Sequence, residues 1–142
     1  MATFNKFYSF ASHYCTGVFD LSTTGSTIKY YLSNAAPSAS AHTVKTDIAE
    51  ITNENGYTAP IDTENTGSMD NATGIFTIGL SAKTVTAATG AVGPFQYVIA
   101  YDDTPSAPVD PLIGWWDRGG ALTLQDGDSF GIHPAASSIT LG

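Results

Sequence analysis

The sequence predicts a mainly β fold, an antiparallel β-sandwich or jelly-roll-like barrel with one short N-terminal helix. Apolar residues alternate with polar ones in several short runs, which is the pattern of strands with one buried face. Gly, Pro, Asn and Asp cluster between these runs, where antiparallel strands need turns. A length of 142 residues fits a single domain over residues 1–142, with strands from about residue 27 to about residue 141.

The first segment is the one good helix candidate. Its apolar residues follow the spacing that places them on one helical face. These residues are Phe4, Phe7, Tyr8, Ala11, Tyr14, Cys15 and Val18. Thr3 can cap the N-terminus, and Gly17 can end the helix in the left-handed conformation. We therefore expect a helix over about residues 4–16 whose aromatic stripe packs on a sheet.

The segments that follow change to the period of strands. Alternation in residues 28–33 predicts a half-buried strand, and residues 43–51 fit a short helix. Further strands are expected at residues 76–80, 84–86, 95–101, 112–116, 121–124, 129–132 and 139–141. A turn at residues 118–120 should end the fourth of these strands. A second turn, at residues 125–128, should join its flanking strands as a hairpin.

Charge and cysteine content exclude several classes of partner and site. Five basic residues against thirteen acidic ones give a net charge of −8, which disfavours nucleic acid and anionic membrane surfaces as partners. Cys15 is the single cysteine, so the chain has no intrachain disulfide and no cysteine-cluster metal site. The N-terminal residues lack the features of a signal peptide, which predicts synthesis in a reducing host cytoplasm.

One catalytic motif occurs in the sequence. The run from Gly127 to Gly131 matches G-x-S-x-G around Ser129. A nucleophile elbow needs a strand before the serine and a helix after it. The following Phe-Gly-Ile-His-Pro cannot start a helix, and no acid lies between Ser129 and the only downstream histidine, His133. We therefore interpret the motif as part of a hairpin and expect no enzymatic activity.

Metal sites are equally poorly supported by the sequence. His13, His42 and His133 are scattered, without the spacing of zinc ligands. The run that begins at Ile51 resembles a calcium loop but lacks its first carboxylate. The acidic pairs Asp102/Asp103 and Asp126/Asp128 are interpreted as solvated turn carboxylates rather than cation sites. No cofactor or metal is expected.

The adjacent pair Trp115-Trp116 is the densest apolar feature. Neighbouring side chains on a strand face opposite sides, so one tryptophan should enter the core. The other then lies either in a second interface or under a segment of the same chain, and the sequence leaves both readings open. Trp and Arg are enriched at interface hot spots. The candidate interface residues are therefore Trp115, Trp116, Arg118, Phe4, Phe7 and Tyr8.

Several blocks together carry a resemblance to a known family. They are Ile28–Pro37, Ile48–Ile51 with Asn55–Tyr57, Gly93–Val98, Asp110–Asp117 and the Leu122–Phe130 region. With these blocks the chain resembles a family of small virion proteins encoded by tailed bacteriophages, over about residues 4–141. The Pro-Leu-Ile-Gly-Trp-Trp-Asp block, which ends at Asp117, is the most specific part.

The resemblance implies a non-enzymatic structural protein of the virion. Its first implication is a capsid decoration (cement) protein, a homotrimer on the capsid surface that binds the major capsid protein and stabilises the head lattice. The alternatives are a tail or head–tail connector component and a fibre or host-binding module. The resemblance carries no catalytic, cofactor or metal-binding residue over to this sequence.

Overall fold

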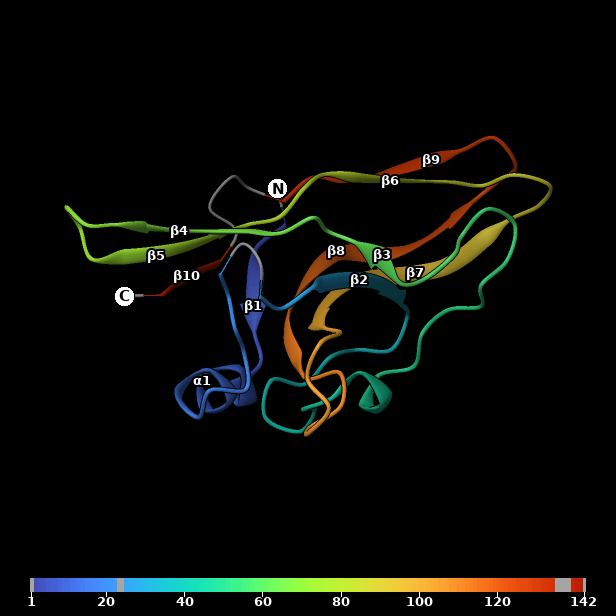
Figure 1. The fold of residues 1–142 in the computed structure, drawn as a ribbon. Coiled ribbons are helices and arrows are strands. Elements are labelled where there is room, and N and C mark those ends of the chain that lie inside the picture. The colour runs from blue at the N-terminus through green and yellow to red at the C-terminus, as the bar shows by residue number, and fades with distance from the viewer. Residues whose placement is uncertain (1, 23–24, 135–138, 142) are drawn as a thin grey trace.

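Antiparallel strands dominate the computed structural model, which describes residues 2–22, 25–134 and 139–141 (Figure 1). The predicted mainly β, antiparallel fold with one helix is confirmed. The largest sheet has five strands, in the order β1 (Phe4–Lys6), β8 (Leu112–Leu124), β7 (Val92–Asp102), β2 (Ile28–Ser33) and β3 (Ile61–Asp62). Because β1 and β3 are its edges in the described part of the chain, this sheet does not close into a barrel.

Two smaller sheets form a second layer over one face of the large sheet. The first contains β10 (Ile139–Leu141), β5 (Ile75–Gly79) and β4 (Thr66–Asp70), and the second pairs β6 (Lys83–Thr86) with β9 (Ser129–Ile132). Figure 1 shows the two sheets extending in opposite directions. This arrangement is sandwich-like, with the main hydrophobic core between the layers.

Both faces of the large sheet are covered, which corrects the prediction of a half-buried strand at β2. Tyr30 and its neighbours on one face belong to the main core, together with Ile78 and Val85 of the second layer. Tyr31 faces the other way, into a second apolar cluster with Ile48. Its hydroxyl donates to the Ile48 carbonyl at 3.4 Å, so loop residues cover this face and leave β2 buried on both sides.

The N-terminal helix α1 (Tyr8–Cys15) is four residues shorter at its start than predicted, because the chain forms a strand first. Phe4 pairs with Trp116 and Lys6 pairs with Gly114 at the edge of β8. Phe7, rather than Thr3, is the extended residue before the helix. Gly17 has φ 78°, which confirms the left-handed helix end. Residues 4–6 therefore form a strand on the free edge of β8, although their periodicity predicts a helix.

The expected helix at residues 43–51 is reduced to one 3₁₀ turn, η1 (Lys45–Asp47). The Asp47 carboxylate accepts the backbone N–H groups of Thr43 at 2.7 Å and Val44 at 3.1 Å, which fixes this turn. Backbone bonds to the loop before β8 hold the segment, from Lys45 N–H to the Asp110 carbonyl at 2.9 Å, for example. These non-local bonds replace the ones that a longer helix would make.

The C-terminal half departs from prediction in how its strands pair. No turn interrupts the chain at residues 118–120, because β8 stays paired with β7 as far as Leu124 and a register irregularity accommodates Gly119 at φ 91°. The turn at residues 125–128 is present, with Asp128 N–H donating to the Gln125 carbonyl at 2.9 Å. The predicted hairpin is wrong, however, since β9 leaves the large sheet and pairs with β6.

Candidate interaction surface

The two tryptophans lie on opposite faces of β8, and the N-terminal segment packs on both. The Trp116 ring lies 4.8 Å from Phe4 and 5.9 Å from Tyr30, on the main-core side. The Trp115 ring lies 4.6 Å from Phe7, in the second cluster. Both tryptophans are partly buried. Of the two readings that the sequence left open, contact with the same chain therefore accounts for part of the surface of each tryptophan.

The remaining candidate residues differ in their exposure. Phe7 is only 1% exposed, so its side chain is part of this chain's own core. Arg118 is exposed, and its Nη1 donates to the Gly120 carbonyl at 2.8 Å. Tyr8 is 71% exposed, the largest exposure among the bulky apolar side chains of the described residues. Tyr8 is therefore the predicted residue best placed to contact a partner.

Helix α1 presents a second apolar side that the sequence reading did not separate from the first. Phe10 points inward, with its ring 5.3 Å from that of Phe19. Tyr8, Ala11, Tyr14 and Cys15 are exposed. Their spacing of three, then four, residues from Tyr8 through Ala11 to Cys15 is itself helical, which is the signal that could have revealed this side.

An apolar groove of about 440 Å³ runs along this side of α1 and ends at β10. Its lining residues are Lys6, Phe7, Tyr8, Phe10, Ala11, Tyr14, Cys15 and Leu141. Lys6 is the only charged residue among them. Leu141 links the groove to the second layer, because it pairs with Phe76 of β5.

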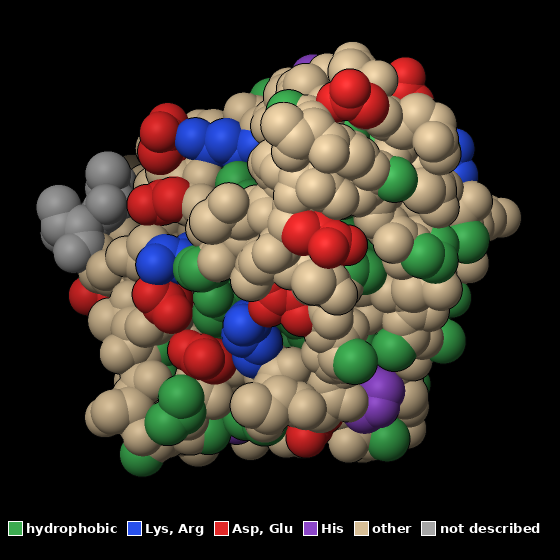
Figure 2. Space-filling view, turned by 90° about the vertical axis from the view of Figure 1, so that its right-hand side faces the viewer, with side chains coloured by type: hydrophobic (Ala, Val, Ile, Leu, Met, Phe, Trp, Pro, Cys, Tyr) green, Lys and Arg blue, Asp and Glu red, His purple; other side chains and the backbone are tan. Residues whose placement is uncertain are grey.

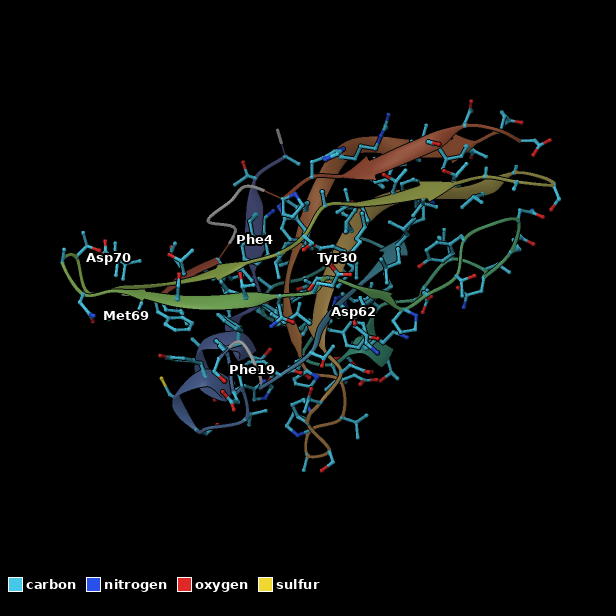
Figure 3. All side chains as sticks on the ribbon, turned by 45° about the horizontal axis from the view of Figure 1, so that its top comes forward. Phe4, Phe19, Tyr30, Asp62, Met69 and Asp70 are labelled. Atoms are coloured by element: carbon cyan, nitrogen blue, oxygen red, sulfur yellow. The ribbon has the colours of Figure 1, made fainter. Side chains whose placement is uncertain are left out.

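The β4–β5 hairpin, residues 66–79, projects beyond the body of the molecule and is called the arm here (Figure 1). Met69 pairs with Phe76, which in turn pairs with Leu141, and residues opposite one another share a face of the sheet. Met69 is 51% exposed. Figure 3 places Met69 and Asp70 at the outer end of the arm. The apolar row on the arm therefore continues the groove. Together they form the helix–arm surface: Tyr8, Ala11, Tyr14, Cys15, Leu141 and Met69.

Charge is distributed unevenly between this surface and the rest of the chain. All thirteen acidic residues lie at or after Asp20, so the segment that forms β1 and α1 carries Lys6 and no acid. On the side of the molecule away from the arm, Figure 2 shows acidic side chains interspersed with lysines and only small, separate hydrophobic areas. The α1 side of the helix–arm surface is thus free of acidic residues, and the arm carries one, Asp70, at its outer end.

A second apolar cavity, of about 310 Å³, is lined in part by Trp116. Val98 and Trp116 of the large sheet line one side of it, and residues 130–134 line the other. His133 is the only ionisable residue in this lining. The cavity is smaller than the groove at α1, and residues of this chain form its lining.

The polar motifs of the sequence do not assemble into a site. Ser129 lies in strand β9, with its Oγ 2.9 Å from Thr86 Oγ1, so the geometry of a nucleophile elbow is missing. Asp126 and Asp128 accept backbone N–H groups from Thr89 and Gln125 at 2.7 and 2.9 Å. Within the described ranges, no three His, Cys, Asp or Glu side chains come close enough together to hold a metal ion.

Asp102, at the end of β7, is a buried carboxylate. One oxygen accepts the Thr104 N–H at 3.0 Å, whereas Oδ2 has no hydrogen-bond partner among the described residues. Burial raises the pKa of Asp102 above its usual range, and the nearby Asp103 adds to this effect. The folded state therefore binds a proton at a higher pH than the unfolded chain does. The resulting stabilisation is complete below the unfolded pKa and is lost as the pH rises through the raised folded pKa.

We expect an Asp102→Asn variant to lose this part of the pH dependence. Between about pH 7 and about pH 4, the wild type should gain stability relative to the variant, because only the wild type takes up this proton. Chemical denaturation at several pH values measures the difference, with the exposed Glu54→Gln as a control. If the wild type and Asp102→Asn respond identically to pH, Asp102 is not protonated in the folded protein over this range.

No protein-family model, no curated protein and no solved structure matches this chain. None of the helices in the described residues is long and apolar enough to cross a membrane. Among the described residues, the feature best suited to binding a partner is the helix–arm surface.

Proposed function

We propose that this chain is a non-enzymatic structural protein of a tailed bacteriophage, a decoration protein that binds the outside of the head. It acts there as a homotrimer in contact with the major capsid protein and stabilises the lattice. The observation that carries this proposal is the helix–arm surface, a large apolar area with exposed aromatic side chains on an otherwise acidic protein.

Exposed apolar area of this kind favours a role in assembly. Contiguous apolar patches on a protein surface mark interaction sites, and aromatic residues are enriched where binding energy concentrates. Tyr8 is 71% exposed and Tyr14 is 43% exposed, on the same helix. A subunit that is permanently docked in a particle would bury them.

The arm supports the same role. β10 pairs with β5 only between Ile78 and Phe76, so the outer part of the arm has two strands in the described structure. A two-stranded hairpin in water is marginally stable by itself. Contact with a neighbouring subunit would stabilise it. Extended hairpins that reach a neighbour suit a lattice protein better than an isolated one.

The charge supports assembly from free subunits. A net charge of −8 keeps unassembled copies soluble and apart. The absence of acidic residues from β1 and α1 lowers the repulsion that assembly through this surface would otherwise meet.

Binding to undecorated capsids tests the proposal. Purified wild-type protein is added to such capsids, and bound copies are counted by quantitative gel analysis and located by electron microscopy. We expect saturation at three-fold or quasi-three-fold positions over the whole shell. Ser129→Ala should bind like the wild type, because its hydroxyl contacts only Thr86 in a surface strand pair.

Other outcomes would contradict the proposal. A single ring of copies at one vertex would indicate a connector component, and no binding to any capsid would remove the decoration function. Loss of binding in Ser129→Ala, without loss of stability, would show that the serine has a role that the non-enzymatic reading denies.

A further inference from the structure

We propose that the helix–arm surface is a self-association surface, on which the groove along α1 of one copy receives the arm of a second copy. The inference rests on the proposed function, because it identifies the contact through which copies of a structural protein would join. It assigns Tyr8 and Tyr14 to the receiving side and Met69 and Asp70 to the inserted side.

The groove and the arm are complementary in shape and polarity. The groove is apolar and has a volume of about 440 Å³, which accommodates several side chains. At the end of the arm, Met69 is 51% exposed and Ile75 is 37% exposed. Methionine is unbranched and flexible, so it fits irregular apolar gaps well. Within the described residues, Lys6 Nζ makes one hydrogen bond, to the Thr140 carbonyl at 3.4 Å, and an ammonium group has two further N–H donors.

The charges of the two features are also complementary. Asp70 is the only charged residue from Thr66 to Gly79, and it lies at the exposed outer end of the arm (Figure 3). Lys6 is the only charged residue in the lining of the groove. Asp70 pairs with Ile75, so these two residues lie on the face of the hairpin opposite to Met69. An arm that enters the groove end-on presents both faces and so brings its one carboxylate toward the one ammonium group of the groove. Such pairs contribute more to orientation and specificity than to raw affinity.

A second copy of this chain is the occupant that these observations favour. A neighbour of the same sequence supplies both an apolar tip with a single negative charge and a groove with a single positive charge. The remaining acidic surface would repel an equally acidic copy. The acid-free segment of β1 and α1 is therefore where two copies approach at the lowest electrostatic cost.

Sedimentation velocity on the full-length chain measures the association. We expect the wild type to form an oligomer and Tyr8→Glu to weaken its association by about tenfold or more. Lys6→Glu and Asp70→Lys should each weaken it, because each places like charges together. The double variant Lys6→Glu/Asp70→Lys should recover most of the association. Val109→Asp is the matched control, because Val109 is 62% exposed but lies outside the helix–arm surface.

Far-ultraviolet circular dichroism of every variant shows whether it folds. This matters most for Asp70→Lys, since Asp70 accepts hydrogen bonds from Ala72 and Thr73 in the turn of the arm. If Asp70→Lys misfolds, Met69→Asp replaces it, and a folded but dissociated Met69→Asp supports the proposal.

Three results would overturn the inference. One is a wild type that remains monomeric at about 100 µM, a concentration at which even weak specific contacts form. The second is a set of variants that all associate like the wild type. The third is a combination of two results: Tyr8→Glu dissociates, and the folded double variant Lys6→Glu/Asp70→Lys associates no better than its two single variants. That combination would exclude the arm as the occupant of the groove.

Failure of this inference and failure of the proposed function give different results. If the wild type decorates capsids but all variants still oligomerise, the proposed function stands and the helix–arm surface is not the self-association surface. If the wild type forms a dimer through this surface and binds no capsid, the self-association surface stands and the trimeric decoration role is wrong.

Discussion

Replacing Trp116 with alanine should lower the free energy of unfolding by about 3 kcal/mol. The indole lies 4.8 Å from the Phe4 ring and 5.9 Å from the Tyr30 ring, and it packs against the main core. Its removal leaves a cavity on the main-core face of the large sheet, beside Phe4 and Tyr30, that the paired backbones cannot close. Chemical denaturation monitored by far-ultraviolet circular dichroism measures the loss.

Tyr8→Ala is the matched control for this experiment. Tyr8 is also aromatic and lies two residues after β1, but it is 71% exposed, so its removal should change stability by less than about 0.5 kcal/mol. A Trp116→Ala protein as stable as the wild type, but unable to join particles, would contradict the intramolecular role. In that case Trp116 would be an interface residue, as one reading of the sequence has it.

Replacing Gly114 with alanine should release β1 from the large sheet and destabilise the fold by about 2 kcal/mol. Gly114 lies opposite Lys6 in β8 and is buried. A Cβ atom there would collide with the Phe4 ring and with the Asn5 backbone carbonyl. The ring can turn, but the carbonyl belongs to the strand itself, so β1 must shift as a unit.

Hydrogen exchange locates this effect. Amide protons of β1 should exchange faster in Gly114→Ala than in the wild type, whereas those at the β2–β7 pairing should keep their protection relative to the new global stability. Gly120→Ala is the control, since open space surrounds the position of its Cβ. Equal protection of β1 in Gly114→Ala and the wild type would show that the strand tolerates the added methyl group.

Both experiments concern the same N-terminal strand, and they change how the aromatic residues are understood. Phe4 is the first residue of β1 and Phe7 follows its last, and they pack on Trp116 and Trp115 respectively. Four of the six candidate interface residues therefore hold β1 against the sheet. Tyr8 follows immediately and is exposed. β1 therefore positions α1, and with it the helix–arm surface.

The sequence by itself determined the fold class and most of the strands. Alternation of apolar and polar residues is a local property, and it identified β2, β5 and β7. β-prone residues identified β6, and turn-forming residues identified the turn at residues 125–128. Gly17 marked the end of the helix in the same way, since a left-handed residue needs no distant partner. In these elements, the structure depends on neighbouring residues, and it agrees with the sequence pattern.

Only the tertiary structure decided which elements meet. Phe4 to Phe7 have the spacing of a helix, yet the unpaired edge of β8 offers them backbone hydrogen bonds and two indole rings. Strand β9 has the pattern of a hairpin partner for β8, but β7 already occupies that side and β6 is available in the second layer. The exposure of Tyr8 and Met69 likewise depends on what packs around them. Periodicity shows which residues share one face of a helix or strand. The residues that pack against that face are far away in the chain, and the local pattern carries no information about them.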